Sequence, residues 1–192
     1  MKTSKKMTLR EVMKDKQIYL RAECLNSKGW KGCENNVLSV AERFTNNLIH
    51  AAKQSADECT LCGPLILEER SGVYRVVQEE QPIILHFIFL AVVIDELHQR
   101  NMITVEVNHI FEDLLKYETV YRIHLDQDSN QFFRDKVIDR IVINEKNKES
   151  SIETTIRMVM DIYSSILQNC SDYKLMELLN SSVKNKFEII IY

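Results

Sequence analysis

The longest apolar run of the chain, residues 82–94, constrains the fold more than any other feature. It spans 13 residues, contains His86 and is followed by two acidic residues. A helix that crosses a bilayer needs about 20 predominantly apolar residues. A shorter run that is apolar on every side is typical of a buried helix. We therefore expect a central helix over 82–99, with Pro82 in its first turn and other elements packed around it.

The scarcity of glycine and proline, four and two residues among 192, bears on the fold class. Sandwiches and barrels depend on many turns rich in these residues. Hydrophobic residues make up 45% and charged residues 28% of the chain, which is typical of a globular protein. We expect one mainly α domain over 1–192, a compact bundle of six or seven helices with one β-hairpin and a short C-terminal strand. The polar stretch 144–150 is the expected sub-boundary.

Two capping boxes mark helix starts. Thr8 with Glu11 predicts a helix over 9–25, and Ser150 with Glu153 predicts one over 152–169. Further helices are expected from 35 to about 61, over 105–117, from about 130 and over 172–183, where apolar residues recur at helical spacing.

Two segments are expected to form strands. Apolar residues on both sides of Ser71 and Gly72 predict a hairpin over 65–77, and 187–192 reads as a terminal strand. A lone hairpin is marginally stable, and an apolar edge strand tends to pair with another chain. These features favour a subunit that assembles with a partner protein or with a second copy of itself.

The segment 82–144 also fits a winged-helix layout. It would consist of helix 82–99, the short helix 105–117 and strands over 120–125 and 140–143. Winged-helix domains read DNA with a basic helix. Helix 105–117 has a single lysine and several acidic residues, which is the wrong charge for phosphate contact. Such a wing is therefore expected to bind protein.

Cysteines provide one candidate metal site. Cys59 and Cys62 have the C-x2-C spacing of a zinc ligand pair, and Cys24 and Cys33 are the remaining candidate ligands. The spacing of this second pair is not that of a standard zinc site. Five cysteines in a chain without an export signal indicate reduced thiols. We predict no metal and no cofactor.

One short motif suggests catalysis. Arg43 and His50 lie seven positions apart, two helical turns, and so share one helix face. The pair resembles the motif of HEPN-type ribonucleases, which act as dimers without a metal. The resemblance covers eight residues and implies that His50 transfers a proton while Arg43 stabilises a phosphorane. It departs from the motif at Phe44, where the family usually has a polar residue.

Charge is distributed unevenly. Residues 1–33 hold nine Lys or Arg against three Asp or Glu, whereas the whole chain has a formal net charge of −3. This basic segment could contact nucleic acid, but the chain as a whole exerts no such attraction. Motifs for nucleotide binding, serine hydrolysis and zinc proteolysis are absent from the sequence.

The sequence favours a non-catalytic adaptor, regulatory or accessory subunit that binds protein in the cytoplasm, without a membrane anchor. We expect the hairpin 65–77, the acidic helix 105–118 and the strand 187–192 to form its binding surfaces. The alternatives are a winged-helix regulator associated with nucleic acid and a HEPN-like ribonuclease.

Overall fold

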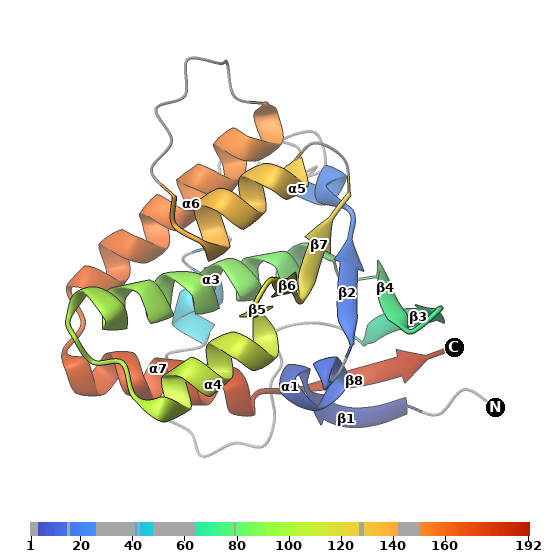
Figure 1. Ribbon diagram of the computed structural model, residues 1–192, viewed down its shortest axis with the longest axis horizontal. Coiled ribbons are helices and arrows are strands. Elements are labelled where there is room, and N and C mark those ends of the chain that lie inside the picture. The colour runs from blue at the N-terminus through green and yellow to red at the C-terminus, as the bar shows by residue number, and fades with distance from the viewer. Residues whose placement is uncertain are drawn as a thin grey trace.

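A computed structural model of the chain describes residues 4–14, 16–25, 41, 43–47, 64–78, 80–126, 129–141 and 150–192 (Figure 1). These residues form a mixed α/β fold with a six-stranded sheet, and the large helices lie on one side of that sheet. The sheet has the strand order β1-β8-β3-β4-β2-β7. Its strands are β1 (Ser4–Thr8), β2 (Gln17–Leu20), β3 (Leu65–Arg70), β4 (Val73–Gln78), β7 (Ile123–Leu125) and β8 (Lys186–Ile191).

Helices surround a central helix, α3. The elements are α1 (Leu9–Met13), the 3₁₀-helix η1 (Ala22–Leu25), α3 (Glu80–Gln99), α4 (Val105–Leu114), α5 (Ser129–Phe132), the π-helix η3 (Phe133–Ile138), α6 (Ser151–Gln168) and α7 (Asp172–Lys184). Residues 43–47 are also helical. A separate two-stranded ribbon joins β5 (Lys116–Tyr117) to β6 (Val120–Tyr121).

Helix α3 is the core of the protein, as the apolar run 82–94 predicts. Its side chains from Ile83 to Ile94 are all buried, and α4, α6, α7 and η3 all contact it. Among the described residues it is the one helix long and apolar enough to cross a membrane. However, 78% of its most apolar 18-residue window is buried inside the protein, which is typical of the core helix of a soluble protein.

The expected mainly α fold is wrong, because the chain builds a six-stranded sheet rather than one hairpin and a terminal strand. Part of the error lies in the predicted helix 9–25. The capping box of Thr8 and Glu11 is present, but helix α1 ends at Met13 and the chain then forms β2. Strand β2 pairs in parallel with β4 and with β7, which lie far along the sequence. Strand propensity depends strongly on such neighbours, so a local pattern does not reveal this strand.

The winged-helix layout is also wrong for the described residues. Residues 120–121 pair within the small ribbon, and 123–125 form β7 of the main sheet. Arg140 and Ile141 are not in a strand, and residues 142–143 lie outside the described part of the chain.

The hairpin and the C-terminal strand form as expected, but both are covered within the chain. The hairpin β3–β4 turns at Ser71 and Gly72, which both have positive φ. Strand β8 lies between β1, its antiparallel partner, and β3, its parallel partner. The C-terminal strand is therefore internal to the sheet and offers no edge to a partner.

Candidate functional site

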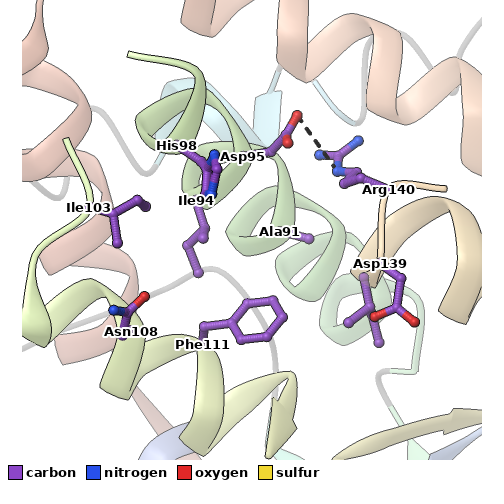
Figure 2. Close-up of a pocket in the computed structure, with 10 residues that line it drawn as sticks. Ala91, Ile94, Asp95, His98, Ile103, Asn108, Phe111, Asp139 and Arg140 are labelled. Atoms are coloured by element: carbon purple, nitrogen blue, oxygen red, sulfur yellow. Dashed lines mark ion pairs between the residues drawn. The ribbon is translucent and has the colours of Figure 1, made fainter. Parts of the chain in front are cut away.

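A pocket of about 360 Å³ lies against α3, between α4 and the segment that follows η3 (Figure 2). Most of its surface is apolar, with a few polar side chains among the apolar ones. This composition is typical of ligand sites. Its lining consists of Ala91, Ile94, Asp95, His98, Ile103, Asn108, Phe111, Ile138, Asp139 and Arg140.

Helical spacing explains how α3 and α4 supply their parts of the wall. The four lining residues of α3 follow the i, i+3, i+4, i+7 spacing that places side chains on one helix face. Asn108 and Phe111 are three positions apart on α4, whose start is capped by the Thr104 side chain accepting from the Val107 N–H.

The third wall comes from an unusual helix end. The π-helix η3 closes with a hydrogen bond from the Asp139 N–H to the Arg134 carbonyl, at 2.8 Å. The Ile141 N–H then donates to the Asp135 carbonyl at 2.8 Å. Between them, Arg140 adopts the left-handed conformation with φ of 54°, a helix-terminating position that glycine usually occupies. Both π-helical turns and strained left-handed residues are concentrated at functional sites.

The guanidinium of Arg140 lies at this wall with donors that have no partner. Its side chain is only 23% exposed, and neither Nε nor Nη2 makes a hydrogen bond. The nearest acidic atom is Asp95 Oδ2, 3.8 Å from Nε, which is beyond hydrogen-bond distance (Figure 2). The same oxygen accepts a 2.9 Å hydrogen bond from Gln99 Nε2. Burial lowers the pKa of the Arg140 guanidinium, and the Asp95 charge opposes that shift.

The neighbouring carboxylate, Asp139, is engaged elsewhere. Lys116 Nζ donates to its Oδ1 at 2.7 Å, and the Tyr121 hydroxyl donates to its Oδ2. The hydrogen bond with Asp139 is the main reason that the pKa of Lys116 is raised. Because Lys116 neutralises Asp139, the other charged side chains of the lining are those of Arg140 and Asp95.

Among the described residues, the pair that most resembles a catalytic nucleophile with its base is Ser182 with His86. Ser182 Oγ lies 3.2 Å from His86 Nε2, but both side chains are buried in the core. Burial lowers the pKa of His86 to about 3, and its Nδ1 has no partner to orient the ring. The pair is not part of the pocket lining, and that lining has neither serine nor cysteine.

The residues that the sequence suggested for chemistry are not in the pocket. Arg43 is exposed on a helical turn, and His50 lies outside the described residues, so the ribonuclease motif stays a prediction. Cys33, Cys59 and Cys62 also lie outside them. Cys24 is described, and its pKa is raised by burial to about 12, which disfavours the thiolate that a metal needs. Groups of three or more metal-binding side chains do not occur within the described part of the chain.

The outer face of the sheet, turned away from α3, is a second candidate surface. It carries the residues that alternate with the buried ones: Lys6, Tyr19, Ile66, Glu68, Val73, Arg75, Val77, His124, Glu188 and Ile190. Strand register places His124, Tyr19, Arg75 and Glu68 in one row across four strands. Tyr19 is 40% exposed, and Arg75 makes no ion pair or hydrogen bond with its side chain in the described structure.

Side chains at one end of this row contact one another. The rings of Tyr19 and His124 stack with centroids 4.5 Å apart. Arg134 Nη2 lies 2.7 Å from His124 Nδ1, and because arginine only donates, Nδ1 accepts and Nε2 carries the proton. That N–H donates to the Tyr121 carbonyl at 3.1 Å. Burial, followed by the charge of Arg134, lowers the pKa of His124, so the ring under Tyr19 is neutral.

Three of the nine basic side chains of segment 1–33 form ion pairs with the rest of the chain. Arg10 pairs with Asp113, Lys16 with Glu69 and Arg21 with Glu80, at N–O distances of 2.5, 2.6 and 2.5 Å.

The chain matches no family model, no curated protein and no solved structure.

Sequence reasoning missed Arg140 and Asp95 as a pair. Each stands in the sequence as an ordinary charged residue, and no local spacing connects positions 45 residues apart. The only local signal was that residues 139–144 fitted either a helix end or a strand.

Proposed function

We propose that this chain is a non-catalytic adaptor, regulatory or accessory subunit that binds a protein partner through the outer face of its sheet, in the cytoplasm. The observation that carries this proposal is an exposed pair of side chains on that face. Tyr19 and Arg75 lie side by side on β2 and β4, and Arg75 has no charged or hydrogen-bonding partner within the described structure.

Tyrosine and arginine are among the side chains most enriched at the energetic centres of protein interfaces. Tyr19 offers a large surface already held in place by His124, so binding costs it little conformational freedom. Val77, Val73 and Ile66 add partly exposed apolar surface beside the pair. A partner that presents a carboxylate to Arg75 and an apolar side chain to Tyr19 would fit this surface.

The basis for assembly thus differs from the one that the sequence suggested. The edges of the hairpin and of strand 187–192 are paired inside the sheet, so they do not require a partner. The hairpin contributes instead through its outward side chains, Arg75 among them. Helix α4 keeps its acidic face, although Asp113 pairs with Arg10.

Neither alternative function gains a specific observation. Nucleic-acid binding through 1–33 is weakened, because three of the basic side chains there are in ion pairs. The ribonuclease alternative depends on His50, which lies outside the described residues.

The test is affinity capture from the native source with the full chain as bait, followed by mass spectrometry and light scattering on the purified bait. The variant Tyr19→Ala/Arg75→Glu should lose the specific partner while keeping its thermal transition, because both side chains are on the surface. The control is Tyr173→Ala on α7, which also removes a tyrosine that is 79% exposed, and it should keep the partner.

A second copy of the chain is one allowed partner. In that case the wild-type chain should scatter as a dimer and the double variant as a monomer. If the double variant captures the same proteins as wild type and the scattering mass is unchanged, the outer face is not the binding surface.

A further inference from the structure

A second pocket, of about 380 Å³, lies between α1, the end of α4 and the residue that joins β6 to β7. We call it the α1–α4 pocket. It has room for one small molecule, and most of its surface is apolar. Its lining consists of Thr8, Arg10, Glu11, Met13, Lys14, Asp113 and Arg122. None of these residues belongs to the outer face of the sheet, so a ligand here goes beyond the function proposed above.

Both carboxylates of the α1–α4 pocket already have partners. Asp113 forms an ion pair with Arg10 at 2.5 Å, which joins α4 to α1. Glu11 Oε2 accepts hydrogen bonds from the N–H and the hydroxyl of Thr8, at 2.7 and 3.0 Å. The bond from the Thr8 N–H is the main reason that the pKa of Glu11 is lowered. Arg10 is thus neutralised by Asp113, whereas Glu11 contributes one negative charge.

Arg122 is held at the pocket and still has free donors. Its Nε donates to the Glu112 carbonyl at 3.3 Å, and its guanidinium carbon lies 5.9 Å from the centre of the Tyr117 ring. The first contact places the guanidinium next to the end of α4, where Asp113 also lines the pocket. Nη1 and Nη2 make no hydrogen bond or ion pair with the described residues. Both atoms are accessible to solvent, so they are open to a ligand.

Lys14 is the second cation of the lining without an acidic partner. It follows the last turn of α1, its side chain is exposed, and it makes no ion pair or hydrogen bond with the described residues. Lys14 and Arg122 bring two positive charges, against the one negative charge of Glu11. This balance favours a ligand with a single negative charge, whereas a phosphate monoester would carry about two.

The shape of the free donors agrees with the charge balance. Nη1 and Nη2 form the end of the planar guanidinium fork, which can donate to both oxygens of one carboxylate. We propose that the α1–α4 pocket binds a small organic carboxylate with an apolar chain. Arg122 donates the two hydrogen bonds, Lys14 adds a positive charge, and the chain lies against the apolar part of the lining.

The test is isothermal titration calorimetry on the full chain at neutral pH with three compounds that share a pentyl chain. These are hexanoate, the neutral hexanamide and the doubly charged pentyl phosphate. Hexanoate should bind about 10-fold or more tightly than hexanamide, the value of a charge-assisted hydrogen-bonded contact. It should also bind more tightly than pentyl phosphate, because Glu11 repels the second charge.

Variants locate the site. Arg122→Gln should weaken hexanoate binding by about 10-fold or more, and Lys14→Gln should weaken it less, because solvent screens an exposed charge. Arg122→Lys keeps the charge without the fork, so it should bind hexanoate more weakly than wild type, and it replaces Arg122→Gln if that variant does not fold. The matched control is Arg75→Gln, which removes another arginine without a partner among the described residues and should leave hexanoate binding unchanged. Because Arg75 belongs to the proposed protein-binding surface, the two proposals can fail separately.

Any of three results would overturn the proposal. The first is no binding of hexanoate at millimolar concentration by the folded chain. The second is hexanamide or pentyl phosphate binding to wild type as tightly as hexanoate. The third is a loss of hexanoate affinity that is no larger in folded Arg122→Gln or Arg122→Lys than in Arg75→Gln.

Discussion

The left-handed backbone at Arg140 gives a sharp test of the structure around the pocket. We compare Arg140→Gly with Arg140→Ala, because both variants delete the guanidinium and the aliphatic stem and differ by one methyl group. Their difference in the free energy of unfolding therefore reports the backbone at position 140. Both variants lose the contact with Asp95, so this loss nearly cancels in the difference.

The magnitude follows from φ. At 54°, a residue with a Cβ is destabilised by about 1–2 kcal/mol relative to glycine. The greater freedom of glycine in the unfolded chain opposes this by about 0.4–1 kcal/mol. The balance leaves Arg140→Gly more stable than Arg140→Ala by about 1 kcal/mol.

The assay is urea unfolding followed by circular dichroism, with equal slopes required for comparison. Ser165, exposed within α6, is the matched control. There the order should reverse, with Ser165→Ala more stable than Ser165→Gly by about 1 kcal/mol, because the backbone is helical. If Arg140→Ala is at least as stable as Arg140→Gly, the left-handed helix end is refuted, together with the placement of Arg140 at the pocket.

Three further predictions concern the core. Because burial lowers the pKa of His86 from 6.5 to about 3, the unfolded chain binds a proton between these values. The free energy of unfolding should therefore fall below pH 6.5, by up to about 1.4 kcal/mol per pH unit. Chemical denaturation at several pH values measures this slope. His86→Gln should remove it, whereas His109→Gln on the surface should not. Phe89→Ala should lower the free energy of unfolding by about 2–5 kcal/mol, since the side chain is fully buried in α3, and a loss under about 0.5 kcal/mol would contradict a central α3. A chain ending at Lys186 should lose its cooperative thermal transition, because it lacks most of the strand between β1 and β3; a native-like melting curve would refute that strand order.

The local elements could be predicted to different degrees from the sequence. The run 82–94 determined the core helix, since a segment that is apolar on every side has no stable place except inside. The capping boxes at Thr8 and Ser150 determined two helix starts, because their hydrogen bonds lie within four residues. Ser71 and Gly72 determined a hairpin turn for the same reason.

Only the tertiary structure decided the fold class. Strand β2 is four residues long and became a strand because β4 and β7 lie on either side of it. The sequence correctly predicts strand β8, but its partners β1 and β3 are more than 100 residues away. Pairing with both of them makes the C-terminal segment an internal strand of the sheet. Backbone pairing across such distances leaves no local pattern.

The candidate sites follow the same division. The sequence determined which side chains were available, whereas packing of η3 against α3 brought Arg140 next to Asp95. Likewise, the register of β2 on β4 placed Tyr19 beside Arg75. Both sites consist of residues that are distant in the sequence. Their chemistry depends on separation and burial, which exist only once the chain has folded.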